Sequence, residues 1–373
     1  MREKAPGVWE VRVEAGRDPV TGRRRQISRT VRGGKRDAQK VLNKLASEAD
    51  TGTHSGTDVT FRELADRWLA LTEGDLSVTT ARRYRDLLKN HITPALGTVK
   101  VHAIRPAQLD ALYAGLITDK GLAPASVRQV HAVIRRAMQQ AVRWGWIATN
   151  PAANATPPRI PKPDLSPPDV EQVGRLLARA NETYPELGRF LHLAASTGAR
   201  RGELCGLRWR DVDRDASAVV IRRAIVEVAG HLTEKDTKTH AARRIALDPG
   251  SLAVLDAQRA EVEQRAAVAE MTVRPDAFVF SLEPDASRPW APGLVTKHFK
   301  TVRDAVGLPD VRLHDLRHFA ATRLLAAGVP VRTVSGRLGH ANAATTLTVY
   351  AHFLEASDQA AADIMGDLLS PTT

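Results

Sequence analysis

The first fifty residues change from a two-residue to a helical hydrophobic period. Apolar and polar side chains alternate over residues 9–13, and a turn-forming stretch separates them from a second, basic strand over residues 23–30. A helix with one apolar face is then predicted by the spacing of Ala38, Val41, Leu42 and Leu45. Residues 51–56 are small and polar, which is typical of a linker. The pattern predicts a small sheet with a helix.

Residues 58 to about 150 keep the helical period throughout. A capping box is predicted at Thr60 and Glu63. An apolar stripe follows it at helical spacing: Phe61, Leu64, Trp68 and Leu71. A later helix turns one set of residues inward: Val127, Val130, Ile134, Met138 and Ala141. Its arginines are left for the outside: Arg128, Arg135, Arg136 and Arg143.

A proline-rich stretch separates this block from the rest of the chain. Seven prolines fall within residues 151–168, which excludes a regular helix and favours a semi-rigid linker. Beyond it, helices alternate with short strand candidates at residues 218–222, 226–228 and 243–247. A last helix has one apolar face, formed by Ala361, Ile364, Met365 and Leu368.

The overall charge favours a polyanionic partner. The 373 residues include 54 Lys and Arg against 42 Asp and Glu, a formal net charge of +12. No apolar run approaches the roughly 20 residues that a spanning helix needs, so nucleic acid is favoured over a membrane. We expect no secretory leader, and the single Cys205 suits a reducing cytoplasm.

The chemistry is concentrated near the C-terminus. His314 and Arg317 are three residues apart and therefore share one face of a helix. Gly339 and His340 follow a short helical run, and Tyr350 comes ten residues after His340. Covalent chemistry on a phosphodiester needs such a set of cationic and proton-carrying groups with a terminal Tyr. The run from Leu313 to Tyr350 resembles the catalytic core of the tyrosine recombinases, the phage integrase family.

A second motif extends this resemblance. Residues 196–213, which begin Ser-Thr-Gly-Ala-Arg-Arg-Gly-Glu, match the first Arg box of the family, and Arg200 stands at its catalytic position. A guanidinium offers a planar fork of donors to phosphate oxygens. We expect Arg201 to point elsewhere, and Glu203 to orient or pack rather than to react.

The segment from Lys235 to Leu247 resembles the strand–turn–strand Lys box of the family, with Lys238 as the general acid. The alternatives are an ordinary turn lysine, or Lys235 in that role.

The resemblance also assigns the remaining catalytic residues. It gives His314 a proton-handling role, Arg317 the second phosphate clamp, His340 a hydrogen bond to the phosphate and Tyr350 the role of nucleophile. A rival interpretation of His314 to His318 is a zinc motif of the H-E-x-x-H type, but Asp replaces Glu and no third ligand is evident. Tyr350 has a rival interpretation too, because a Tyr on an apolar helix usually belongs to a core.

The basic N-terminal segment resembles the arm-type DNA-binding domain of many integrases. Residues 1–50 carry thirteen Lys and Arg against seven Asp and Glu. A small sheet can lie in a major groove as a ribbon, although a plain charged surface is the alternative. The candidate DNA-binding residues are Arg23, Arg24, Arg25, Arg29, Arg128 and Arg135.

The resemblance implies a multidomain protein, mainly α with small β-sheets. Its parts are an arm-type domain over 1–50 with a three-stranded sheet plus helix, a helical core-binding (SAM-like) domain over 58–155, and an α+β tyrosine-recombinase catalytic domain over 165–373.

The implied function is site-specific recombination by the integrase of a mobile element or prophage, through a 3′-phosphotyrosyl intermediate and without cofactor or metal. The implied partners are double-stranded DNA, three further copies in a homotetramer, and an excisionase or DNA-bending host factor. A non-enzymatic DNA-binding regulator and a type IB topoisomerase-like nickase are the alternative functions.

Overall fold

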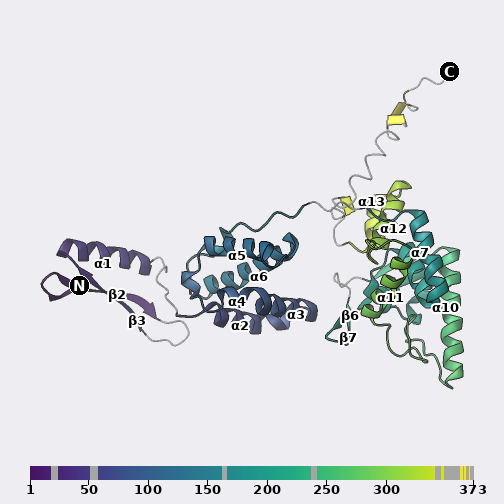
Figure 1. Cartoon of the computed structure of the whole chain (residues 1–373). Coiled ribbons are helices and arrows are strands. Elements are labelled where there is room, and N and C mark those ends of the chain that lie inside the picture. The colour runs from purple at the N-terminus through teal and green to yellow at the C-terminus, as the bar shows by residue number, and fades with distance from the viewer. Residues whose placement is uncertain are drawn as a thin grey trace. The chain divides into compact units, whose positions relative to one another are not determined.

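The computed structural model describes residues 1–17, 24–50, 58–161, 166–236 and 242–340, together with positions 346–347, 362–363, 365–366 and 369. The chain divides into two compact units, Met1–Lys162 and Pro163–Thr373. Helices dominate both units, and small antiparallel sheets complete them (Figure 1). The predicted fold class, mainly helical with small sheets, is confirmed.

A three-stranded antiparallel sheet opens the chain. Its strands are β1 (Arg2–Ala5), β2 (Val8–Arg17) and β3 (Arg24–Arg32), in the order β1-β2-β3. Helix α1 (Lys35–Asp50) covers one face of this sheet and buries Val11, Ala38 and Leu45 in a small core. The alternating strand and the helical spacing read from the sequence are both present. The sheet and its helix have their own apolar cluster, as a separate folding element needs.

A helical block follows within the first unit. Its main helices are α2 (Phe61–Thr72), α3 (Val78–Leu87), α4 (Thr93–Leu96), α5 (Pro106–Thr118) and α6 (Pro124–Arg143). The capping box is present: the Thr60 amide donates to Glu63 at 2.7 Å, and the Glu63 amide donates to the Thr60 hydroxyl. The predicted apolar stripe is wrong at its end. Leu71 is 60% exposed because the last turn of α2 packs on the cluster through Leu69, and residues two apart in a helix lie on nearly opposite sides.

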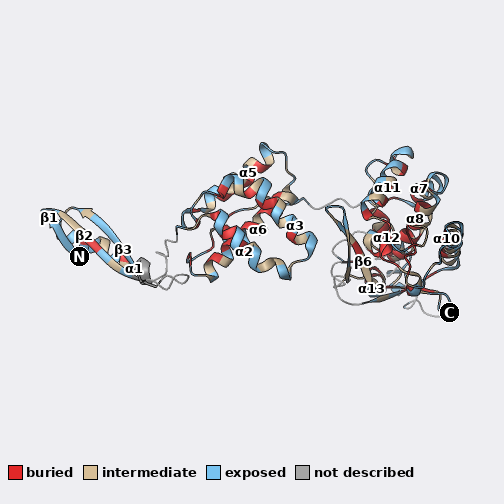
Figure 2. Ribbon diagram, turned by 90° about the horizontal axis from the view of Figure 1, so that it is seen from below, coloured by how far each residue is buried: buried red, intermediate tan, exposed pale blue. Residues whose placement is uncertain are grey.

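Helix α6 is the centre of the helical block. Its predicted inward residues, Val127, Val130, Ile134, Met138 and Ala141, are all fully buried. The arginines predicted for the outside, Arg128, Arg135, Arg136 and Arg143, are exposed. Figure 2 shows the buried stripe of α6 facing its neighbouring helices. Both expectations about α6 are confirmed.

In the part of the second unit that the structure describes, helices form most of the core and two small sheets complete it. Its helices are α7 (Val170–Thr183), α8 (Pro185–Thr197), α9 (Arg201–Cys205), α10 (Pro249–Val268), α11 (Pro292–Ala305), α12 (Asp315–Ala326) and α13 (Val331–Leu338). One sheet has the order β4-β5-β8, with β4 (Val212–Asp213), β5 (Ala218–Ile221) and β8 (Arg243–Ala246). The other pairs β6 (Arg223–Val228) with β7 (His231–Asp236). Helix α8 contributes Leu187, Phe190 and Leu191 to the main core.

The strands near Lys238 differ from the predicted strand–turn–strand hairpin. The candidate strands at 218–222 and 243–247 are present as β5 and β8, which pair with each other. The strand before Lys238 is β7, which pairs with β6 instead. Residues 237–241, which include Lys238, lie outside the described residues and connect two different sheets. The predicted hairpin is wrong because β7 pairs with β6, the strand that precedes it in the sequence, while β8 pairs with β5.

The predicted last helix is described only in part. Ala361, Ile364 and Leu368 lie outside the described residues, and Met365 is helical and 53% exposed. Across the described positions, no helix combines the length and apolar character needed to cross a membrane.

Candidate active site

A glycine turn at the end of α8 positions the first residues of the site. Gly198 ends α8 with a left-handed backbone, φ 65°, and its amide donates to the Ala194 carbonyl at 3.1 Å. A Cβ at this position would lie 2.5 Å from Cδ2 of Leu338 in α13. Both the dihedral and the close approach therefore require glycine. The turn lets α9 start at once, with Arg200 as its N-cap residue.

Arg200 is held by a buried carboxylate. Its Nη1 donates to Oε1 of Glu203 at 2.8 Å, and its backbone amide donates to Oε2 at 2.8 Å. The Glu203 side chain is 3% exposed, whereas that of Arg200 is 40% exposed. The guanidinium is thus fixed on one side and open on the other. Its Nη2 reaches the carbonyl of Gly339, at 3.3 Å.

Arg317 approaches the same place from α12. It is 3% exposed, and its Nη1 donates to the carbonyl of Gly198 at 2.7 Å. This bond ties α12 to the turn that positions Arg200. The two arginines come from segments more than one hundred residues apart in sequence, and one glycine turn fixes both of them.

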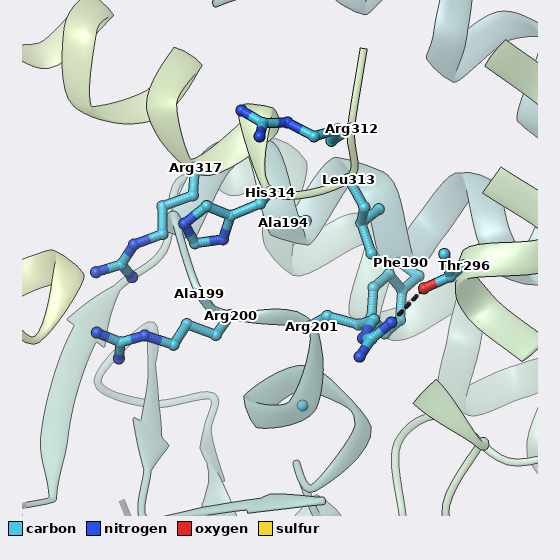
Figure 3. A pocket seen from close by; sticks show the side chains of 11 residues that line it. Phe190, Ala194, Ala199, Arg200, Arg201, Thr296, Arg312, Leu313, His314 and Arg317 are labelled. Carbon is cyan, nitrogen blue, oxygen red and sulfur yellow. Dashed lines mark hydrogen bonds between the residues drawn. The ribbon is translucent and has the colours of Figure 1, made fainter. Parts of the chain in front are cut away.

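A pocket of about 390 Å³ joins these groups. Its lining includes Arg200, His314 and Arg317 together with apolar Phe190 and Leu313. In Figure 3 the guanidinium groups of Arg200 and Arg317 extend to the same side, and the ring of His314 lies between these two side chains. Arg201 turns the other way and donates to the hydroxyl of Thr296 on α11.

The histidines of the site favour the neutral form. Burial, then the charges of Arg317 and Arg200, lowers the pKa of His340 to about 4. The pKa of His314 is lowered by loss of solvation and then by His318 and Arg317. His314 is nonetheless an exposed residue. His340 follows the left-handed Gly339, and its Nδ1 lies 2.8 Å from the hydroxyl of Thr346.

Among the described residues, the zinc interpretation gains no third ligand. The rings of His314 and His318 meet edge to face, with centroids 5.0 Å apart. The structure, over the residues it describes, brings together no group of three or more His, Cys, Asp or Glu side chains with metal-ligand geometry. Asp315, the intervening carboxylate, instead accepts hydrogen bonds from Arg312, including one at 2.9 Å.

Of the six predicted catalytic residues, Arg200, His314 and Arg317 line the pocket, and His340 adjoins it through Gly339. Lys238 and Tyr350 lie outside the described residues. Lys235, the alternative to Lys238, is in β7 opposite Ala224.

Arg243 is a residue of this region that the sequence reasoning did not single out. It forms a double hydrogen bond to Glu203, at 3.0 Å and 2.5 Å. The signal was present, because the Lys-box resemblance itself includes an arginine ahead of an apolar strand.

The N-terminal sheet divides its basic residues between two faces. The register pairs Val11 with Arg29, so Arg29 lies on the face that α1 covers, although its side chain is exposed. Arg12, paired with Ser28, lies on the open face. The alternation that buries Val11 would have revealed this from the sequence. Arg23 lies outside the described residues, as do the side chains of Arg24 and Arg25, whose backbone belongs to β3.

The candidate DNA-binding residues of α6 are available to solvent. Arg128 and Arg135 are both exposed. Nη1 of Arg128 donates to the carbonyl of Pro158 at 3.3 Å, which leaves the rest of its guanidinium fork for a ligand.

Comparisons with known proteins agree on one family. Residues 169–356 match the model described as "Phage integrase family", and residues 60–117 match "Phage integrase, N-terminal SAM-like domain". The putative prophage phiRv2 integrase of Mycobacterium tuberculosis (strain ATCC 25618 / H37Rv) is 26% identical over 338 residues, covering 89% of this chain and 84% of the relative. The ICEBs1 integrase of Bacillus subtilis (strain 168) is 24% identical, covering 97% and 98%.

Solved structures share the fold. The Tn1549 transposon integrase in complex with transposon right end DNA superposes with a TM-score of 0.70 at 18% identity, covering 83% of this chain and all of that one. A lambda integrase tetramer bound to a Holliday junction gives a TM-score of 0.57 at 21% identity, covering 93% and 96%. The family model matches half of the chain, and the matched half includes the glycine turn, the arginines and the histidines described above. This chain therefore belongs to the phage integrase family.

Proposed function

We propose that this site-specific recombinase cuts and rejoins DNA through a covalent bond between Tyr350 and a 3′-phosphate. The observation that supports this best is the pair of guanidinium groups, Arg200 and Arg317, directed to one side of a single pocket. Transfer at phosphorus builds negative charge on the non-bridging oxygens. Fixed cations stabilise that charge without having to reorganise during the reaction.

His340 supplies a neutral hydrogen-bond donor in this proposal. Its lowered pKa keeps the imidazole uncharged near neutral pH. When the Thr346 hydroxyl donates to Nδ1, the ring proton resides on Nε2 and can be donated to a phosphate oxygen. His314, also neutral and beside Arg317, is suited to proton handling at the tyrosine hydroxyl.

Tyr350 and Lys238 complete the chemistry. The Tyr350 oxygen bonds to phosphorus as the bond from phosphorus to the 5′-oxygen breaks. The tyrosine proton leaves to a base such as His314, and Lys238 gives a proton to the departing 5′-oxygen. The 5′-hydroxyl of a partner strand then attacks the phosphorus and gives its proton back to Lys238. The bond from phosphorus to the tyrosine oxygen breaks, and Tyr350 regains its proton from His314. Because the intermediate keeps the bond energy, this sequence needs no cofactor.

The proposed domains divide the DNA-binding work. Residues 1–50 form an arm-type module that uses the sheet and its basic residues Arg23, Arg24, Arg25 and Arg29. Residues 58–155 form a core-binding domain with Arg128 and Arg135 on α6. Residues 165–373 form the catalytic domain. The partners proposed are double-stranded attachment sites and a homotetramer, with an excisionase or DNA-bending host factor as an accessory, in the cytoplasm.

A joining assay separates this function from its alternatives. Plasmids carrying the DNA that flanks the gene and the matching target are incubated with the wild-type protein and with Tyr350→Phe. We expect joined products with the wild type and none with the variant. Binding without joining by the wild type would support a regulator, and relaxation of supercoiled DNA without joining would support a topoisomerase-like nickase.

A further inference from the structure

We propose that Arg243 is a positioning residue for the recombination reaction: through the buried carboxylate of Glu203 it fixes Arg200, and through the turn at Gly339 it fixes the start of the His340 segment. This inference rests on the proposed function, because it assigns Arg243 a task at the same phosphate site.

The first contact of Arg243 is its fork onto Glu203. Nη1 donates to Oε1 at 3.0 Å and Nη2 to Oε2 at 2.5 Å. The same two oxygens accept from Nη1 and from the backbone amide of Arg200. Glu203 is therefore a shared anchor between two guanidinium groups, one of which, Arg243, is largely buried while Arg200 is open to the pocket.

The second contact of Arg243 is with the end of α13. Its Nε donates to the carbonyl of Arg337 at 3.0 Å. A Cβ on Gly339 would lie 2.8 Å from Nη1 of Arg243, so the left-handed turn before His340 packs directly against this guanidinium. Arg200 reaches the carbonyl of the same Gly339. One side chain of β8 thus contacts both the holder of Arg200 and the turn that leads to His340.

The positive charge of Arg243 helps to keep the buried Glu203 ionised. Burial raises the pKa of Glu203, but the hydrogen bonds and charges of Arg243 and Arg200 outweigh it and hold this pKa below its ordinary value. Among the described residues, the cations that donate hydrogen bonds to Glu203 are Arg200, the N-cap residue of the same helix, and Arg243 from β8. Arg337 of α13 is directed elsewhere, with Nη1 on Ala246 and Nη2 on Ser196. Without Arg243, the burial effect would favour a protonated Glu203, which holds Arg200 less strongly.

Loss of Arg243 should make DNA cleavage sensitive to pH. In Arg243→Gln the Glu203 pKa rises, so the carboxylate that anchors Arg200 is present at high pH and lost as the pH falls. We expect single-turnover cleavage of a nicked core-site duplex, at saturating DNA, to fall at least about tenfold below the wild type near pH 6 and to recover toward it near pH 8.5. The double variant Glu203→Gln/Arg243→Gln, with no carboxylate, should be slow at every pH and lack this step.

Arg244→Gln is the matched control. It removes the same charge from the next residue of β8, whose Nη2 donates to the carbonyl of Ala216 instead. Arg244→Gln should cleave like the wild type across the pH range. Arg243→Lys keeps the cation but loses the fork, so it should show no pH step but still cleave more slowly than the wild type, with unchanged DNA affinity.

The outcomes are distinguishable. A pH profile of Arg243→Gln parallel to that of the wild type would overturn the inference. If Arg243→Gln does not fold, as judged by its thermal transition, Arg243→Lys decides: wild-type cleavage by Arg243→Lys overturns the inference, and slower cleavage at unchanged affinity supports it. Arg200→Gln in the same assay tests the proposed function separately, because undiminished cleavage by that variant would remove Arg200 from the site whatever Arg243 does.

Discussion

At the scale of single residues, the site contains cations that neighbouring acceptor groups hold in place. Arg200 is held by Glu203, and Arg317 by the Gly198 carbonyl. The sequence identified Arg200, Arg317 and His340 by their motif positions. It did not show that Arg243 and Glu203 are partners, because the two are forty residues apart and belong to different elements, β8 and α9.

Lys238 offers the sharpest chemical test of a single residue. Lys238→Ala should slow cleavage by about 10² or more, because the 5′-oxygen then leaves without a general acid. A substrate with sulfur in place of that bridging 5′-oxygen needs no proton to leave, so single-turnover cleavage of it by Lys238→Ala should approach the wild-type rate. Lys235→Ala is the matched control and should behave as the wild type on both substrates. A Lys238→Ala defect that persists undiminished on the sulfur substrate would show that Lys238 only binds phosphate.

At the scale of elements, helices were predicted better than strands. The apolar spacing in α1 and α6 identifies their buried faces because helical periodicity is local. Strand β7 was missed because His231–Asp236 is mostly polar and is stabilised by pairing with β6. Strand partners depend on contacts that the local sequence does not record.

The glycine turn between α8 and α9 can be tested by adding one methyl group. Gly198→Ala should lower the free energy of unfolding by about 2–4 kcal/mol, through the unfavourable dihedral and the overlap with Leu338. Cleavage should fall too, because the turn carries Arg200 and Leu338 precedes His340. Gly307→Ala is the matched control: its φ is 72°, but a Cβ there meets nothing within 4 Å. Equal destabilisation by the two substitutions, measured by chemical denaturation, would refute the role given to the Leu338 contact.

At the scale of the whole molecule, composition predicts the order of parts. The sequence predicts linkers at 51–56, which lie outside the described residues, and at the prolines of 151–168, which are described only in part, between segments with different hydrophobic periods. Two of these segments have distinct apolar clusters within the first unit, one around Val11 and one around Ile134. What composition cannot give is the relation of each segment to DNA, because a basic surface is compatible with many nucleic-acid sites.

Deleting residues 1–50 tests whether the N-terminal segment reads a site of its own. We expect cleavage of short core-site substrates to be largely unchanged, whereas recombination of full attachment-site DNA should fall sharply. A tethered second reader raises effective concentration without adding core contacts. The isolated segment should bind DNA with strong salt dependence, since its Lys and Arg displace condensed counterions. Identical footprints for the full and truncated proteins would contradict this role.

The central claim is the covalent bond at Tyr350, and the most direct measurement is the capture of that bond. The protein is incubated with an end-labelled, nicked core-site duplex, denatured with detergent, and the DNA-linked peptide is identified by mass spectrometry after proteolysis. The account predicts a detergent-resistant adduct on Tyr350 with the wild type, and none with Tyr350→Phe, which should still bind the duplex. An adduct formed by Tyr350→Phe, or a linked peptide that lacks Tyr350, would contradict it.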